Sequence, residues 1–460
     1  MSKGRLLLGL ALAAGAMSGQ PAPVPGALTL KQAVDQALGG YPAIQVSREQ
    51  IEAAAAGIRL ARTAYLPRVD GLAQVNRATR NNVFGMLLPQ SVLPSISGPV
   101  LGSNNFGTVW GSAAGALVAW EPFDFGLRRA NVAVAEAARA EAEAARRRTE
   151  FEVALATADA YLTLVAAQET VRGAQAGVER AGVAARSTAA LVGAQLRPGA
   201  DESRAQAELA AARTQLIRAQ QAEEVARATL AQFTGLAPAG ITTASEGLLR
   251  LPPAKAPEPP DMSANPLVLD QAATLEQARA QLRALARSYF PRFAVQGAAY
   301  ARGTGAEVSG LRLGGLNGLA PSVQNYALGF TVTFPLSDLP STRAREAAQS
   351  AAIRAQMARQ AQLAAELRAQ WNVAVANVEG SRRVAENTPV QVSAARAAAQ
   401  QATARYQAGL GTIDAVAEAQ RLLTQAEIDD ALAHLAVWRG LLGIAAVAGD
   451  IRPFAAEASQ

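Results

Sequence analysis

The side chains that most often do chemistry in enzymes are scarce in this sequence. His434 is the only histidine and there is no cysteine, so disulfides, thiolate metal sites and a nucleophile–histidine–acid triad are excluded, while serine–lysine chemistry stays open. A lone imidazole cannot build a zinc site, and we expect His434 to be a packed or surface residue of the last helix. The glycine-rich stretch 310–318 (GLRLGGLNG) lacks the Gly-Lys-Ser/Thr of a phosphate-binding loop. We therefore expect no enzyme, no cofactor and no metal site.

The charge of the chain is modest and widely distributed. The formal net charge is +6, and the arginines are scattered along alanine-rich runs rather than gathered into one patch. The triplet Arg146-Arg147-Arg148 points around a helix rather than along one face. We therefore expect solvated helix faces and no nucleic-acid binding.

The N-terminus has the form of a secretory signal. Residues 1–22 place Lys3 and Arg5 before the apolar run Leu6–Ala14 and then small residues, and cleavage is expected between Ala16 and Ala22. A short buried helix is the alternative. After this segment we find no run of about 18 apolar residues, the length that a membrane-spanning helix needs.

The rest of the chain is one unit written twice. Residues 41–68 align without gaps on residues 265–292 and end in AYLPR and SYFPR, so that Tyr65 and Pro67 recur as Tyr289 and Pro291, 224 positions further on. Later matches, such as WEPFDFGLRRA (residues 120–130) with FPLSDLPSTRA (residues 334–344), lie 214 positions apart. The first copy therefore has ten extra residues between its YLPR and WEPFDFG motifs.

Each copy is predicted to contain a helix, two strands and two further helices. Proline disfavours helical geometry at the residue before it, so Pro67 and Pro291 should end the first helix, and Pro122 and Pro335 lie where the second strand ends. Alternation follows: Tyr326, Leu328 and Phe330 share one face of a strand whose other face is small and polar. The predicted organisation is a first repeat at 23–233 (strands at about 67–82 and 106–121, helices at about 127–196 and 201–233), a Pro/Gly-rich linker at 234–264, a second repeat at 265–450 (strands at about 292–303 and 323–335, helices at about 341–408 and 412–448) and a C-terminal tail at 451–460.

The predicted elements suggest a conduit. At 1.5 Å per residue the long helices would span about 100 Å, with Pro389 kinking one of them. Seams such as Leu155, Ala158, Leu162 indicate lengthwise packing. Four strands cannot close a membrane barrel, because the smallest common ones have about eight, so several chains would have to share one. The alternative is a soluble scaffold or adhesin, in which the strands form a soluble sheet that carries coiled-coil arms.

Several motifs together resemble the TolC family of outer-membrane efflux channels. They are the duplicated YLPR and YFPR helix ends, WEPFDFGLRRANV, EVALATADAYLTLVAAQE (residues 152–169) and RYQAGLGTIDAVAEAQRLLTQAE (residues 405–427). The resemblance implies an α+β membrane protein with a long α-helical coiled-coil barrel continued by a transmembrane β-barrel, in which a homotrimer shares four strands per chain. It also implies a site in the bacterial outer membrane, surrounded by outer-membrane lipid and extending into the periplasm. The partners would be a periplasmic adaptor (membrane fusion) protein and an inner-membrane pump of a tripartite efflux or type I secretion system, and the cargo would be small molecules.

The resemblance also places a gate at the periplasmic tip, where helices converge after two glycine-containing turns. These turns would hold Gly199 in the first copy and Gly409 and Gly411 in the second. Tyr406 matches a tyrosine that can latch the closed tip to an acid of the first copy. The basic latch residue of some relatives would fall at Gly411, so the resemblance supplies no basic partner here.

Acidic residues complete this implied gate. Asp201 holds the first acidic position of copy one, while the second carries Arg204; in copy two the acids are Asp414, one residue early, and Glu418. The hypothesis is that Asp201 and Tyr406 form the latch and that Glu418, repeated by three-fold symmetry, forms a carboxylate ring that attracts cations. The alternative is that these acids only cap the helices that start after the turns.

Overall fold

The computed structural model describes residues 27–79, 107–254, 258–307 and 312–459. They form two compact units, and each unit contains segments of both repeats. The first unit comprises Met1–Ser47, Arg146–Leu269 and Gln362–Gln460, and the second Arg48–Ala145 and Asp270–Ala361. The duplication therefore does not give one unit per copy.

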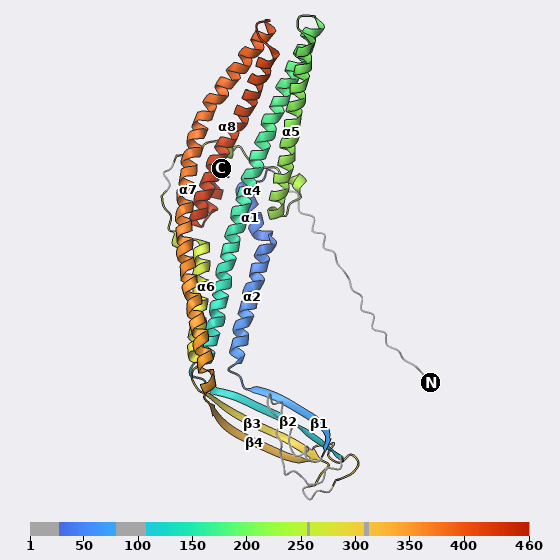
Figure 1. Ribbon diagram of the computed structural model, residues 1–460, viewed down its shortest axis with the longest axis vertical. Coiled ribbons are helices and arrows are strands. Elements are labelled where there is room, and N and C mark those ends of the chain that lie inside the picture. Colours follow the sequence, from blue (N-terminus) through green and yellow to red (C-terminus); the bar gives the residue numbers. More distant parts are fainter. Residues whose placement is uncertain (1–26, 80–106, 255–257, 308–311, 460) are drawn as a thin grey trace, which may run out of the picture. The chain divides into compact units, whose positions relative to one another are not determined.

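Two long helical hairpins dominate the chain (Figure 1). Helix α4 (Leu127–Gly193) is followed by α5 (Gly199–Thr234), and α7 (Leu339–Gln407) by α8 (Ile413–Ala448). Alanine, the strongest helix former, recurs through all four. The bounds agree with the expected ranges to within three residues, and α7 continues through Pro389.

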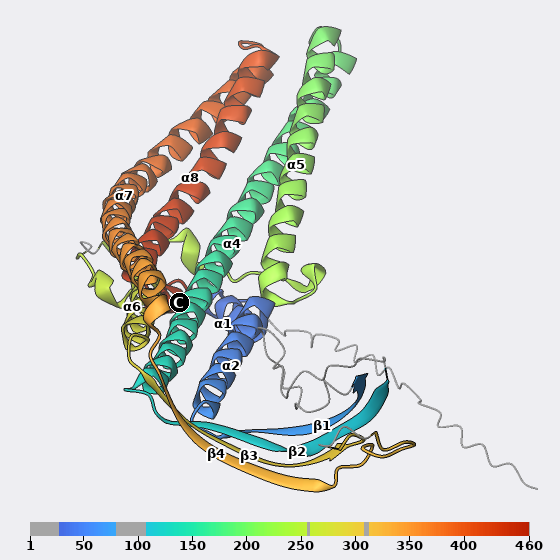
Figure 2. The same cartoon turned by 60° about the horizontal axis from the view of Figure 1, so that its bottom comes forward.

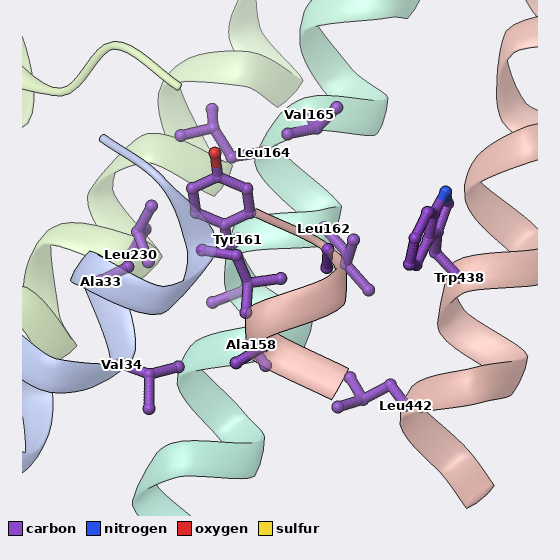
Figure 3. Close-up of a cluster of buried hydrophobic side chains, with 14 of the residues drawn as sticks. Ala33, Val34, Ala158, Tyr161, Leu162, Leu164, Val165, Leu230, Trp438 and Leu442 are labelled. Carbon is purple, nitrogen blue, oxygen red and sulfur yellow. The ribbon is translucent and has the colours of Figure 1, made fainter. Parts of the chain in front are cut away.

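The core of the first unit lies where α4 meets shorter elements (Figure 3). Of the predicted seam, Ala158 and Leu162 of α4 are at most 1 % exposed and Leu155 is half-buried, while Tyr161 and Val165 beside them are completely buried. They face Leu230 of α5 and Trp438 of α8. The Tyr161 hydroxyl lies 2.7 Å from the Leu28 carbonyl oxygen and 3.0 Å from that of Ala244. One buried phenol therefore fixes both the segment before the first helix and the linker.

Three features of this unit differ from the simple repeat. Helix α1 (Leu30–Gly40), which the sequence analysis missed, begins with a capping box formed by Thr29 and Gln32. The linker 234–264 carries three short 3₁₀ turns (Pro238–Gly240, Gly247–Leu249 and Met262–Ala264) and buries Leu248. The tail contains a helix, α9 (Arg452–Glu457), whose Phe454 is also buried. The linker and the C-terminal tail are therefore both part of the core.

Helix α8 corrects the expectation that no later helix is long and apolar enough to span a membrane. In the described part of the chain it alone meets that criterion of length and hydropathy. Its apolar side chains pack inside the unit, however, and Val437, Trp438 and Leu442 are buried. The composition of α8 is thus also that of a core helix.

The second unit contains the only sheet found among the described residues (Figure 2). Its strands are β1 (Arg68–Thr79), β2 (Thr108–Phe123), β3 (Arg292–Thr304) and β4 (Val323–Thr333), all antiparallel in the order β1-β2-β3-β4. Helix α2 (Pro42–Thr63) precedes β1, and α6 (Pro266–Arg287) precedes β3. Because the sheet has four strands, β1 and β4 are edge strands, and one side of each has no strand partner among the described residues. The expected strand ends at 80–82 and 106 fall outside the described residues.

The helix–strand corners of the two copies are built differently. In copy one the Trp120 indole donates to the Tyr65 carbonyl oxygen (3.1 Å), while Arg128 lies over the Tyr65 ring and pairs with Asp124 at 2.8 Å. In copy two the Tyr289 hydroxyl donates instead to Glu346 (2.7 Å). The repeated tyrosine is therefore held by a cation in one copy and by an anion in the other.

Candidate functional site

The two hairpin turns use the left-handed backbone region at matching positions of the repeat. Gly409 has φ 82° and Gln195, 214 positions earlier, has φ 61°. Glycine adopts this region without the steric cost that a side chain brings. Gly199, expected as a turn residue, instead begins α5, and Gly411 packs so closely that an added Cβ would lie 3.2 Å from the Tyr406 nitrogen.

Tyr406 lies at the centre of the contact between the two hairpin ends. Its side chain is 3 % exposed and packs with Ala185, Ala205, Ile413 and Val416. Its hydroxyl donates a hydrogen bond of 3.0 Å to Asp201 Oδ2. Burial raises the pKa of the phenol, and the hydrogen bond to Asp201 raises it further. Tyr406 is therefore a neutral donor that joins the second hairpin to the first.

A basic residue that the sequence analysis missed completes this contact. Arg197, in the turn before α5, donates to the Tyr406 carbonyl oxygen and places its guanidinium carbon 4.2 Å from the centre of the Tyr406 ring. A cation over an aromatic face is electrostatically attracted to it. The sequence signal was a lone arginine directly before Pro198-Gly199, but its partner lies 209 positions away.

Asp201 combines the two roles that the sequence left open. It lies in the first turn of α5, where the helix dipole favours an anion. The N-cap position belongs to Pro198, which makes no capping side-chain hydrogen bond, and Asp201 Oδ2 accepts a hydrogen bond from the Tyr406 hydroxyl. Asp201 therefore lies at the start of α5 and accepts a hydrogen bond from the other hairpin.

The other sequence-predicted gate residues, Arg204, Asp414 and Glu418, belong to a chain of alternating charges across α5 and α8 that also includes residues the sequence analysis did not name. Arg204 pairs with Asp414 at 3.0 Å and with Glu208 at 3.2 Å. Arg421 lies 3.8 Å from Glu208 and 2.8 Å from Glu418. The within-helix spacings could be read from the sequence, whereas the links from Arg204 to Asp414 and from Arg421 to Glu208 could not.

This chain of charges borders a groove between α4, α5 and α8. The groove has a cavity volume of about 360 Å³, and Glu208, Glu418 and Arg421 line it. The Glu418 side chain is 74 % exposed and is already paired with Arg421. A ring of bare carboxylates therefore does not follow from the geometry of one chain.

The sheet has two chemically distinct faces, because side chains of cross-strand partners share a face. Val69, Val118, Gly297 and Leu328 are such partners and lie on an apolar face. This face carries exposed large side chains along its length: Val69, Val75, Val118, Trp120, Tyr326, Leu328, Phe330 and Val332. Leu328 alone is 82 % exposed. One face of the sheet is thus apolar, and no other described residues cover its large side chains.

The opposite face is more polar. It carries Arg68 and Asp70 of β1, Gln296 of β3, and Asn325 and Thr331 of β4, together with small residues and the larger Leu72, Leu117, Tyr300 and Val323. Alternation of apolar and polar faces is the pattern of a strand that separates lipid from a polar lumen.

No candidate metal site is formed by the described residues. They contain no group of three or more histidine, cysteine, aspartate or glutamate side chains placed to hold a metal. His434 Nδ1 lies 2.7 Å from the Asp430 carbonyl oxygen of its own helix.

Known proteins give a consistent picture of this fold. The family model described as "Outer membrane efflux protein" matches residues 33–236 and 262–450. A comparison with curated protein sequences gave no match.

Solved outer-membrane channels share the fold at low sequence identity. The CmeC channel of Campylobacter jejuni is 15 % identical with a TM-score of 0.72, and the alignment covers 97 % of this chain and 94 % of CmeC. For VceC of Vibrio cholerae the values are 16 %, 0.70, 92 % and 96 %. For the open state of MtrE of Neisseria gonorrhoeae they are 18 %, 0.68, 92 % and 89 %. With most of its length matched by the family model, the chain belongs to the outer membrane efflux protein family and is an outer-membrane channel of an efflux system.

Proposed function

We propose that three copies of this chain form one passive conduit across the outer membrane. The observation that carries the proposal is the sheet. It has an exposed apolar face and two edge strands, β1 and β4, that lack an outer partner in the part of the chain that the structure describes. In lipid every strand edge must be paired, so other copies have to supply the partners. Three copies would contribute twelve strands, enough for a closed barrel with the polar faces inside.

The helical hairpins extend this conduit into the periplasm under the proposal. Helices of 67 and 69 residues are about 100 Å long, which suits a tunnel rather than a compact domain. A periplasmic adaptor and an inner-membrane pump would dock at or beside these helices. The channel itself would do no chemistry, and the pump would provide the energy that exports small molecules.

The hairpin ends would form the periplasmic gate. Support comes from the hydrogen bond between Tyr406 and Asp201, the contact of Arg197 with Tyr406, and the ion pair of Arg204 with Asp414. Each contact joins the α4–α5 hairpin to the α7–α8 hairpin. Releasing them would let the hairpins separate and the tip widen.

Fractionation of cells tests the proposal against a soluble scaffold or adhesin. The conduit predicts a protein of the outer-membrane fraction that migrates as a trimer on a gel without heating and as a monomer after heating. It also predicts conductance when purified protein is added to a planar lipid bilayer. A soluble periplasmic monomer without conductance would overturn the proposal.

A further inference from the structure

The polar face of the sheet carries more positive than negative charge. Its described residues include three arginines, Arg68, Arg292 and Arg302, but only one acid, Asp70. On the apolar face the described side chains include a single charge, Arg77, which lies over the Trp110 ring. The excess of arginine is therefore confined to the face that would line the lumen.

We propose that this face makes the conduit anion-selective, with Arg292 as the principal selectivity residue and organic anions as the preferred class of cargo. The inference rests on the proposed trimeric conduit, because only closure into a barrel turns the polar face into a lumen wall. Carboxylates, sulfonates and phosphates are the anionic groups that a guanidinium binds with paired hydrogen bonds.

Arg292 and Arg68 occupy the same place in the two copies. Each is the last residue of its repeated pentapeptide and the first residue of its strand. Arg68 pairs with Ala119 of β2, and Arg292 with Thr333 of β4, both on the polar face. Three-fold symmetry would therefore bring six arginines to one end of the barrel.

The two arginines differ in how their charge is compensated. Arg68 pairs with Asp70 at 2.8 Å, two residues further along the same face. The position equivalent to Asp70 in copy two is Ala294. Arg292 is exposed and forms no ion pair with any acid in the described part of the chain. Its charge is thus free to act on ions in the lumen.

The acids near this end of the sheet differ in how far they are compensated. Asp124 is buried and paired with Arg128. Glu121, in the stretch where β2 and β3 lose register, and the exposed Asp338 after β4 add negative charge that Arg292 has to outweigh. At the hairpin tip the acids Asp414 and Glu418 also have arginine partners. The field of the sheet should therefore dominate the choice between anions and cations.

Reversal potentials in planar bilayers under a KCl gradient test the proposal. The wild-type channel should have a chloride-to-potassium permeability ratio above one. Arg292→Gln should lower this ratio by roughly twofold or more, because clefts lined with one sign of charge raise the local counter-ion concentration by about tenfold or more. Asp70→Asn should raise it. Arg77→Gln, on the apolar face, is the matched control and should leave it unchanged.

Blocking experiments extend the test to cargo chemistry. Naphthalene disulfonate should interrupt the current of the wild-type channel, this effect should weaken in Arg292→Gln, and tetraethylammonium should have little effect on either. Channels that conduct but prefer potassium, or an Arg292→Gln channel with an unchanged ratio, would overturn the anion selectivity while leaving the conduit intact. A wild-type protein that forms no channel would overturn the proposed function and this inference with it.

Discussion

At the residue scale, Tyr406 shows how a single side chain can join two hairpins. It is an almost completely buried phenol whose oxygen reaches Asp201 and whose ring lies under Arg197. A net hydrogen bond of this kind contributes about 1 kcal/mol, and more when one partner is charged. A contact of this strength suits the proposed gate, because it would favour a closed tip and still allow opening.

Removing either end of the Tyr406–Asp201 bond should ease opening. We expect Tyr406→Phe and Asp201→Ala to raise single-channel conductance or the fraction of time spent open, since each loses the bond and keeps most of the packing. Planar-bilayer recordings measure both quantities. Glu202→Ala is the control, because Glu202 lies in the same turn and bonds only Gln206 of its own helix. Identical recordings from all three variants and the wild type would show that the bond is not a latch.

Glu169 provides a residue-scale test that depends on pH. Its side chain is 6 % exposed, one carboxylate oxygen has no described partner, and the other is held by Arg172. Burial raises the pKa of the carboxyl, opposed by Arg172. Because the folded pKa lies above the unfolded value, stability should fall as pH rises through the interval between the two values.

Glu169→Gln removes the charge and should remove this pH dependence. We expect its melting temperature to exceed that of the wild type by about 2 °C at neutral pH, and to match it below pH of about 4. Thermal unfolding of the detergent-solubilised protein measures this. A variant that is less stable than the wild type at neutral pH would mean that the ion pair with Arg172 outweighs the cost of burying the carboxylate.

At the element scale, the corner between the second strand and the helix after it is stabilised differently in the two copies. Asp124 accepts hydrogen bonds from the backbone nitrogens of Gly126 and Arg128 and from the Arg128 guanidinium. Both charged side chains are only 10 % exposed. Asp338, the equivalent residue of copy two, is exposed. The copy-one corner therefore depends on a buried ion pair that copy two lacks.

Asp124→Asn should destabilise the protein far more than Asp338→Asn. Losing one partner of a buried pair leaves an uncompensated charge and costs about 3 kcal/mol or more, whereas exposed substitutions stay within about 0.5 kcal/mol. Thermal unfolding of the detergent-solubilised protein compares the two variants directly. An equal loss of stability in both variants would show that Asp124 contributes no more to stability than Asp338 does.

The sequence predicted elements whose signal is long and local. Alanine-rich runs gave α4, α5, α7 and α8, and alternation around Leu328 gave β4, because the period of the apolar residues is visible in the chain itself. Helix α1 was missed although Thr29 and Gln32 form a capping box. It lies before residue 41, where the alignment of the two copies begins, so the repeat gave no signal for it. The contacts of Arg197 with Tyr406 and of Arg204 with Asp414 could not be predicted. They depend on how the two hairpins pack against each other, and residues far apart in the sequence meet there.

At the scale of the whole molecule, duplication has been used to make two similar hairpins that are not interchangeable. The turn of copy two has Gly409 in the left-handed region where copy one has Gln195. Copy one supplies Arg197 and Arg204, and copy two supplies Tyr406 and Asp414. In these contacts an arginine of copy one therefore meets a tyrosine or an aspartate of copy two.

A charge exchange across the hairpins tests whether this asymmetry keeps the tip closed. Arg204→Asp places two acids opposite each other at Asp414, and Asp414→Arg places two arginines there, so either variant alone should open more readily than the wild type. The double variant restores an attractive pair with reversed polarity and should return conductance towards the wild-type value.

Since both side chains are about half exposed or more, the pair should contribute about 1 kcal/mol or less, a change of up to roughly fivefold in the ratio of open to closed channels. High salt should shrink the difference between the single variants and the wild type, because screening acts on exposed charges. If the double variant opens as readily as the sum of the two single changes predicts, the two residues act independently and the ion pair does not hold the hairpins together.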